Sequence, residues 1–554
     1  MIEHIGNLFA FIGGLGMFLY GMNIMADGLQ KSAGGKMKQL LGYLTNNRIL
    51  GVLVGALVTA IIQSSSATTV MVVGFVNAGI LNLTQAVGVI MGANIGTTIT
   101  AWLVSASEWA AFAKPEFLAP LILGIGAFIL LFSKKQKTRM GAEIAIGFGI
   151  LFIGLSSMSG AISVYKDSPI FAQAFATLGG NPFLGIITGA VVTALIQSSS
   201  ASVGILQTLA LNGIVNWPAA IYITLGQNIG TCITALISSM GANRTAKRAA
   251  SIHLMFNVAG AIVFGILMTA AFHIFPAWTT MHVTSTGISI FHTIFNITNT
   301  LIMFPFAGLL VKLSGIIVKG QDEQTDEEDE EQAVLRHLDD RILESPSFAV
   351  ENAVKEVVRM GGIVSDNLKF AMDSMLAEEP DPGMVERVLK KEKMINNLEK
   401  MLTEYLIKIS NLSLTERQTA VVNDLFYTVS DIERVGDHAE NLAEFVQYRI
   451  DHQVVFSEDA KEELKAMCDA VLDCYNSSVK ARETEEIEYV RKVVKLEDEV
   501  DNMEEELRET HIARLSAGKC KAESGVIFLD AISNMERVSD HAINIAGYVK
   551  DEIQ

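Results

Sequence analysis

The chain has 554 residues, half of them hydrophobic, and a formal net charge of −18. Residues 1–320 hold 15 Lys and Arg against 6 Asp and Glu, whereas residues 321–554 hold 27 against 54. A single soluble domain is excluded, because residues 49–107, 168–243 and 249–311 contain no charged side chain, and about 20 apolar residues already span a bilayer as a helix. We therefore predict an all-α protein with a polytopic membrane domain over residues 1–320.

Seven apolar segments are predicted to cross the membrane in chain order. They are residues 7–26, 83–104, 117–133, 141–160, 216–240, 247–272 and 287–312. Lys and Arg cluster at residues 31–48, 134–139, 244–248 and 312–319, and the positive-inside rule places such clusters in the cytoplasm. We expect a multi-pass protein of the plasma (inner) membrane, surrounded by the lipid bilayer, with its C-terminal part in the cytoplasm.

Two further apolar segments are residues 49–80 and 183–213. The predicted sides of the flanking loops require each of them to enter and leave the membrane on the same side. Each is therefore predicted to be a re-entrant helical hairpin. Near their centres lie GALVTAIIQSSSA (Gly55 to Ala67) and GAVVTALIQSSSA (Gly189 to Ala201), which are identical at eleven of thirteen positions.

The sequence around the hairpins is duplicated as well. GANIGTTIT (residues 92–100) matches GQNIGTCIT (residues 226–234) at the same offset of 134 residues, and residues 14–22 resemble residues 147–155. The number of crossings between the copies is odd, so the second copy is inverted. Repeats of about residues 7–107 and 141–240 are thus predicted to have inverted topology, as in many secondary transporters.

The QSSS segments predict a binding site in the membrane. A helix broken inside the bilayer exposes backbone N–H groups that suit an anion, and serine and glutamine side chains donate and accept hydrogen bonds. Because Arg and Lys occur only at the ends of the predicted spans, at Lys247, Arg248 and Lys312, a multivalent anion bound within the membrane would need an accompanying small cation. The predicted site residues are Gln63, Ser64, Ser65, Ser66, Gln197, Ser198, Ser199 and Ser200. For Asn94, Thr97, Thr98, Asn228 and Thr231 of the NIGT segments, binding and helix packing both remain open.

The paired QSSS and NIGT segments and the stretch AKRAASIHLMFN (residues 246–257) resemble the type II sodium/phosphate cotransporter family over about residues 7–312. The resemblance implies inorganic phosphate as substrate and the sodium ion as coupling ion. It also implies that both bind at the QSSS residues during an alternating-access cycle. Gln227 and Cys232 stand where the first copy has Ala93 and Thr98, which leaves the number of sodium ions open.

The acidic part begins with QDEQTDEEDEEQ, and residues 321–344 are predicted to be an acidic linker. Beyond it, apolar residues at helical spacing, such as Val422, Leu425 and Val429, predict a helical bundle over residues 345–554. DIERVGDHAENLA (residues 431–443) resembles NMERVSDHAINIA (residues 534–546), and residues 390–402 resemble residues 495–507. The duplication predicts two units of three helices each.

These patterns resemble the PhoU family, which is associated with phosphate regulation. Carboxylates one helical turn apart lie on one face and repel each other unless a hard cation is bound. The resemblance implies multinuclear sites for a divalent or iron-type metal at such pairs: Glu433 and Asp437, Glu497 and Asp501, and Glu536 and Asp540. Alternatively, Arg434 and Arg537 pair with these acids on a wet surface. Next to Glu392, Asn396 replaces the second carboxylate.

The sequence thus predicts a sodium-coupled phosphate transporter regulated by a cytoplasmic PhoU-like domain. Two alternatives stay open: a phosphate-sensing membrane signalling protein, or a transporter of another small oxyanion or carboxylate. An enzyme is not expected, since the chain has neither a glycine-rich phosphate loop with lysine nor a nucleophile motif with partners. No nucleic-acid partner is expected, whereas a regulatory protein bound to the acidic part and an oligomeric assembly are both compatible with the sequence.

Overall fold

The computed structural model describes residues 2–42, 47–108, 115–166, 168–320 and 338–553. Within these ranges all regular elements are helices, and one isolated antiparallel bridge joins Asn216 and His282. The prediction of an all-α protein is confirmed. The chain divides into two compact units: unit 1 consists of residues 1–324 and 339–348, and unit 2 consists of the remaining residues.

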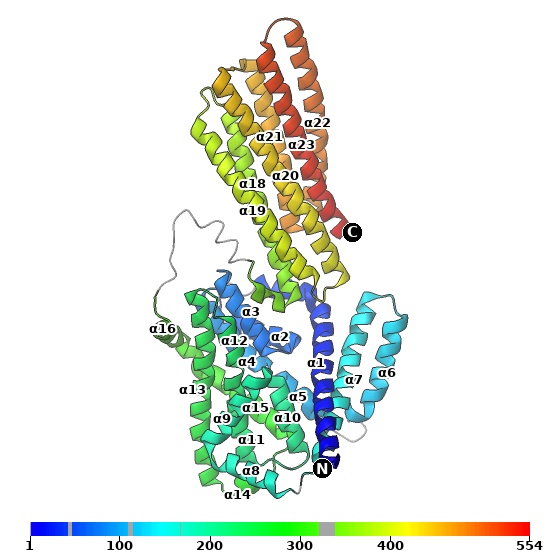
Figure 1. Cartoon of the computed structure of the whole chain (residues 1–554), viewed down its shortest axis with the longest axis vertical. Coiled ribbons are helices and arrows are strands. Elements are labelled where there is room, and N and C mark those ends of the chain that lie inside the picture. The colour runs from blue at the N-terminus through cyan, green and yellow to red at the C-terminus, as the bar shows by residue number, and fades with distance from the viewer. Residues whose placement is uncertain (1, 43–46, 109–114, 167, 321–337, 554) are drawn as a thin grey trace. The chain divides into compact units, whose positions relative to one another are not determined.

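Unit 1 contains the apolar helices (Figure 1). They are α1 (Ile2–Gly42), α2 (Arg48–Ile62), α3 (Ser65–Asn77), α4 (Leu83–Gly96), α5 (Thr98–Ser105), α6 (Pro115–Phe132), α7 (Gln136–Ser163), α8 (Pro169–Gly180), α9 (Pro182–Ile196), α10 (Ser199–Leu211), α11 (Trp217–Gly230), α12 (Cys232–Ser238), α13 (Arg244–Ile274), α14 (Ala277–Thr280), α15 (Ser285–Met303) and α16 (Ala307–Ile317). Short 3-10 helices lie at Ala106–Glu108, Phe304–Phe306 and Asp340–Glu344.

Six of the described helical segments are long and apolar enough to cross a membrane. They are Glu3–Ala33, Leu83–Glu108, Gln136–Ser163, Trp217–Ser238, Arg244–Ile274 and Ser285–Ile317. Each contains or overlaps one predicted crossing segment, and the seventh prediction, residues 117–133, falls on the shorter apolar helix Phe117–Phe132. Large apolar side chains also face outward, for example Phe117, Phe132 and Leu195, as expected for helices in contact with lipid. Unit 1 is therefore a membrane domain.

The predicted segment 287–312 is not one helix. Helix α15 ends at Met303, a 3-10 turn covers Phe304–Phe306, and α16 starts at Ala307. Pro305 explains the interruption, because proline lacks the N–H group that would continue the helical ladder.

Duplicated glycines let neighbouring helices of unit 1 approach closely. Helix α2 packs against α4, and α9 packs against α11. A Cβ atom on Gly92 would collide with the carbonyl oxygen of Val52, and one on Gly226 would collide with that of Ile186. Both contact pairs are related by the 134-residue offset, so the sequence duplication is also a duplication of packing.

Helices α1 and α7 cross in the same reciprocal way. A Cβ atom on Gly14 would lie 2.9 Å from the carbonyl oxygen of Gly154, and one on Gly21 would lie 2.6 Å from that of Gly147. Gly14 corresponds to Gly147 in the duplication, and Gly21 corresponds to Gly154. Gly14 therefore contacts the counterpart of Gly21, and Gly21 contacts the counterpart of Gly14.

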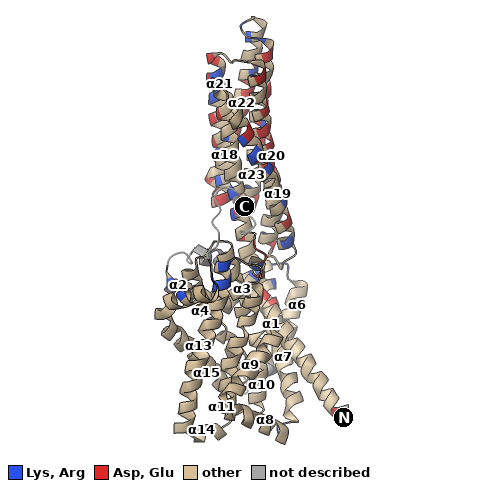
Figure 2. Ribbon diagram, turned by 60° about the vertical axis from the view of Figure 1, so that its left-hand side comes forward, with Lys and Arg blue, Asp and Glu red and all other residues tan. Residues whose placement is uncertain are grey.

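Unit 2 consists of long helices: α18 (Pro346–Leu376, whose first three residues belong to unit 1), α19 (Pro382–Ser410), α20 (Glu416–His452), α21 (Glu458–Thr484), α22 (Ile487–Ser516) and α23 (Ala522–Ile553). The predicted apolar seam of Val422, Leu425 and Val429 is buried. Charged residues are spread along these helices, whereas the spans of unit 1 carry few (Figure 2). Three helices belong to each sequence copy, so the predicted tandem bundle is confirmed.

Candidate functional site

Both QSSS segments break a helix with the same backbone geometry. Gln63 ends α2 with φ 57°, and Gln197 ends α9 with φ 56°. The Oγ of Ser64 accepts a hydrogen bond from the N–H of Ala67 at 3.1 Å, and that of Ser198 accepts one from Ala201 at 3.2 Å. A left-handed residue that ends one helix and a serine cap that starts the next are both local devices, which is why identical sequences produce identical turns.

The remaining serines of each segment form the first turn of α3 and of α10. Ser65, Ser66, Ser199 and Ser200 are between 3% and 8% exposed. Their hydroxyl groups make no hydrogen bond to any other residue that the structure describes. The N–H groups in the first turn of a helix also lack an intrahelical partner. Each break therefore presents donors without protein acceptors on largely buried residues, and such a helix start suits an oxyanion.

The two breaks differ in their long-range contacts. Gln63 is buried, its Nε2 donates to the carbonyl oxygen of Ala60, and its Oε1 accepts from Thr100 Oγ1 at 3.1 Å. Gln197 is exposed, and the Oγ1 atom of Thr234, the counterpart of Thr100, is buried without a described partner. Thr100 and Thr234 were not among the predicted site residues. Their position at the end of the duplicated GANIGTTIT and GQNIGTCIT segments is the signal that could have identified them.

The NIGT residues divide into two groups. Asn94 Nδ2, Thr98 Oγ1 and Thr231 Oγ1 donate to carbonyl oxygens of their own helical turns, at 2.9, 2.7 and 3.0 Å respectively, while Thr97 joins α4 to α5. These contacts are the ones expected of polar residues packed inside a helix.

Asn228, in contrast, faces α15. Its Nδ2 donates to Asn296 Oδ1 at 2.9 Å, and its Oδ1 lies 3.1 Å from His292 Nε2. Asn228 therefore connects the second repeat to a helix outside the duplication.

The second arm of each broken pair packs against the other repeat. Helix α3 contacts α12, and α10 contacts α5. Figure 1 shows α3 beside α12 and α10 beside α5 in the lower part of the chain trace. Between described residues, no side-chain hydrogen bond joins the first QSSS segment to the second, so a single pocket formed by both remains a prediction.

In unit 2, the carboxylates predicted to bind metal come together in the second bundle. Ligand oxygens of Glu497, Asp501 and Asp540 lie within 4.8 Å of one another. Burial and the neighbouring carboxylate of Asp501 raise the pKa of Glu497. Three oxygens at this spacing, in a site where the acids repel one another, fit a hard cation.

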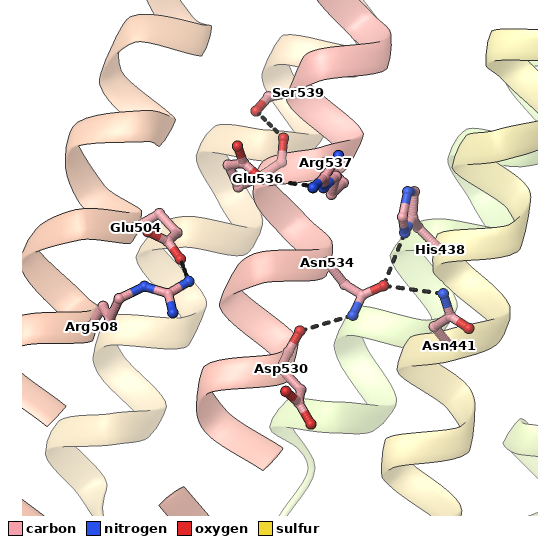
Figure 3. A network of polar contacts seen from close by, with 9 residues as sticks. All are labelled: His438, Asn441, Glu504, Arg508, Asp530, Asn534, Glu536, Arg537 and Ser539. Atoms are coloured by element: carbon pink, nitrogen blue, oxygen red, sulfur yellow. Dashed lines mark hydrogen bonds and ion pairs between the residues drawn. The ribbon is translucent and has the colours of Figure 1, made fainter. Parts of the chain in front are cut away.

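Glu536 lies outside this group of three. Its nearest cation is Arg537, whose Nε is 4.0 Å from a Glu536 oxygen (Figure 3). The pKa of Glu536 is raised by burial and by Asp540, against the opposing effect of Arg537. The effect of Arg537 on this pKa is therefore smaller than the effects of burial and of Asp540.

In the first bundle, Glu392 occupies the position that Glu497 has in the second bundle. This side chain is 2% exposed, and neither of its oxygens has a hydrogen-bond partner among the described residues. Burial, and then Asp437, Glu440 and Glu433, raise the pKa of Glu392 to about 8. Gly436 makes room for it, since a Cβ atom there would lie 2.7 Å from a Glu392 oxygen. Glu433 and Asp437 thus share their site with a carboxyl group that is neutral at pH 7 when no cation is bound.

The raised pKa of Glu392 predicts a pH-dependent stability. Because its pKa rises from 4.5 to about 8 on folding, the folded state binds the proton more tightly, and this stabilisation is complete below 4.5 and is lost as the pH rises through 8. We expect Glu392→Gln to make the unfolding temperature of unit 2 less dependent on pH, measured on the full chain with a chelator present. The exposed control Glu506→Gln should behave like the parent, and equal pH profiles for all three proteins would contradict the assignment.

A duplicated set of polar contacts joins the two bundles, and Figure 3 shows one of its two halves, around Asn534. His438 Nδ1 and Asn441 Nδ2 lie 2.9 and 3.1 Å from Asn534 Oδ1. In the mirrored contact, His541 Nδ1 lies 2.8 Å from Asp431 Oδ1. Each histidine directly follows an aspartate predicted to bind metal, so α20 and α23, which carry these aspartates, are fixed to each other beside both carboxylate clusters.

Comparison with known proteins agrees with this two-part organisation. The family model described as Na+/Pi-cotransporter matches residues 17–160 and 168–296, and the PhoU domain model matches residues 357–446 and 464–549. A Salmonella typhimurium protein named "Putative inorganic phosphate export protein YjbB" is 23% identical over 521 residues, which cover 94% of this chain and 93% of that protein.

Two further matches cover one part of the chain each. "Uncharacterized protein YqeW" of Bacillus subtilis is 30% identical over 292 residues, which cover 51% of this chain and 89% of that protein. The crystal structure of PhoU from Pseudomonas aeruginosa matches with 19% identity and a TM-score of 0.35, and the match covers 37% of this chain and 97% of that structure.

Proposed function

Since the chain belongs to the Na+/Pi-cotransporter family and carries a PhoU domain in the same polypeptide, we propose that unit 1 carries inorganic phosphate across the membrane together with sodium ions. The observation that supports this most directly is the pair of helix starts with four largely buried serines whose hydroxyl groups have no described protein partner. Phosphate offers acceptor oxygens for these hydroxyls and for the first-turn N–H groups.

Sodium ions would balance the charge of phosphate at this site. The described spans contain no basic side chain near the QSSS turns, so the helix N-termini supply only partial positive charge. Neutral oxygens accompany the serines in both repeats. Gln63 and Gln197 directly precede the serines in sequence, and Gln63 is hydrogen-bonded to Thr100, whose counterpart in the second repeat is Thr234. Neutral oxygens of this kind are suited to sodium, which motivates the coupling.

The difference between the two repeats supports an alternating-access cycle. In a transporter built from inverted repeats, alternating access rocks or gates one repeat against the other, so equivalent positions of the two repeats differ in any one state. The contact of Gln63 with Thr100 and the missing contact between Gln197 and Thr234 are such a difference between equivalent positions. We take the two broken pairs to be re-entrant hairpins that enter from opposite faces of the plasma membrane.

Labelled phosphate flux in proteoliposomes tests this proposal. We expect flux in the full-length protein to rise when a sodium gradient is applied and to disappear when potassium replaces sodium. Flux that ignores sodium would overturn the coupling, and phosphate binding without flux would favour a sensing protein instead. Sulfate and arsenate as competitors distinguish phosphate from other oxyanions.

The direction of transport in the cell is a second part of the proposal. The relative from Salmonella typhimurium, which matches over nearly the whole chain, carries the name "Putative inorganic phosphate export protein YjbB", and this name favours export. Efflux from phosphate-loaded vesicles, compared with uptake under the reversed sodium gradient, measures which direction the protein supports. Faster uptake under matched gradients would count against export.

We also propose that unit 2 lies in the cytoplasm, regulates transport, and holds a divalent or iron-type metal at Glu497, Asp501 and Asp540. When bound, the metal would neutralise these carboxylates. Asp501→Asn should weaken metal binding roughly tenfold or more, because affinity follows the number of charged ligands. Metal content and titration calorimetry of the purified protein measure this, with the exposed Glu505→Gln as control.

Asn396→Asp gives the reciprocal test in the first bundle. Asn396 occupies the position of Asp501 in the duplication, so the substitution restores the lost carboxylate beside Glu392. We expect the number of tightly bound metal ions per chain to increase. An unchanged metal content in both Asn396→Asp and Asp501→Asn would contradict the proposed ligand sets.

A further inference from the structure

Residues 339–348, which we call the docking segment, include the last six residues of the predicted acidic linker but belong to unit 1. They comprise the 3-10 helix Asp340–Glu344 and the first turn of α18. Ile342 is 0% and Phe348 1% exposed, and both lie in one hydrophobic cluster with residues of α3 and α13. The ring of Phe348 meets that of Phe75 edge-on, with centroids 5.6 Å apart. The docking segment is therefore packed as part of the core of unit 1.

Polar contacts fix the docking segment to the end of α3. Asn77 Nδ2 donates to Asp339 Oδ2 at 2.7 Å, and Asn77 Oδ1 accepts from the N–H of Asn243 at 2.8 Å. Asn243 is also the N-cap of α13. One side chain thus connects the docking segment, the end of α3 and the start of α13.

The surface that receives the docking segment exists in only one of the two repeats. Gly74, Phe75 and Asn77 correspond to Thr208, Leu209 and Leu211 at the 134-residue offset. A Cβ atom on Gly74 would lie 2.9 Å from Arg341 Cβ, so the threonine of the second repeat would not fit here. The duplication alone does not explain these three residues, whereas docking of residues 339–348 does.

From this we infer that the docking segment is an autoinhibitory clamp. This inference rests on the proposed transport function. Helix α3 has 13 residues, begins at Ser65 in the QSSS turn and ends at the clamp. A bound clamp holds α3 against α13 and opposes the movement of α3 in the transport cycle. Helix α18 starts inside the clamp at Pro346, and its residues from Ala349 onward belong to unit 2. A change in unit 2 can therefore release or tighten the clamp through one continuous helix.

Release and locking of the clamp test the inference in the full-length protein. Ile342→Asp removes the buried side chain, and Gly74→Thr introduces the residue of the second repeat. We expect either change to raise sodium-driven phosphate flux about fivefold or more, the size of a typical coupling between sites. Ile342→Val should leave the flux unchanged. For locking, Asn77→Cys with Asp339→Cys in a Cys520→Ser background replaces two side chains that contact each other, and a short, cleavable thiol cross-linker should slow flux reversibly.

Hydrogen exchange at the end of α3 provides a readout that does not depend on transport. Faster exchange in Ile342→Asp and Gly74→Thr with unchanged or lower flux would overturn the inference, and so would a cross-link between residues 77 and 339 without effect on flux. If the parent protein moves no phosphate in the same vesicles, the proposed function itself is overturned, while hydrogen exchange still reports whether the segment docks. The two failures are thereby distinguished.

Discussion

Phosphate flux should fall about tenfold or more in Ser65→Ala and in Ser199→Ala, because each change removes a hydroxyl whose hydrogen bond to a charged ligand is worth about 1.5–3 kcal/mol. Neither serine caps a helix, since Ser64 and Ser198 accept the capping bonds, so the turns should remain intact. Initial rates at several phosphate concentrations measure the effect.

The exposed Ser163 provides the control for this pair. Ser163→Ala should transport at the parental rate, since this hydroxyl lies on α7 and donates to its own helical turn. Parental rates in both Ser65→Ala and Ser199→Ala would remove the assignment of the QSSS turns as the phosphate site. A loss in one variant alone would restrict the site to one repeat.

Loss of folded protein is the result expected from Gly92→Val or Gly226→Val. The added side chain would collide with the backbone carbonyl of Val52 or of Ile186, where two helices touch without intervening side chains. Separating them forces strain or a gap that costs about 1–3 kcal/mol or more. The yield of monodisperse protein and its unfolding temperature measure this outcome.

Gly141→Ala is the matched control, because a Cβ atom at this exposed helical glycine meets nothing within 4 Å. Alanine is favoured over glycine inside a helix by roughly 0.5–1 kcal/mol, so this variant should be as stable as the parent or slightly more stable. An unfolding temperature of Gly226→Val equal to that of the parent would show that α9 and α11 tolerate separation.

Several features followed from the sequence because their causes are local. The long uncharged stretches required a membrane domain, since charged side chains are costly in lipid. The QSSS turns repeat faithfully because the capping partners lie within four residues of each other. The interruption at Pro305 was missed, although the proline itself carried the signal.

The tertiary structure decided the features whose partners are distant in sequence. Gln63 and Gln197 share a local sequence and a backbone conformation, yet Gln63 is buried against Thr100 and Gln197 is exposed. Glu392 is buried over Gly436, and residues 339–348 dock on α3 rather than extending the linker. Local sequence sets φ and the caps through contacts within one turn, whereas burial and long-range partners depend on which other helices arrive at the same place, and periodicity alone does not contain that information.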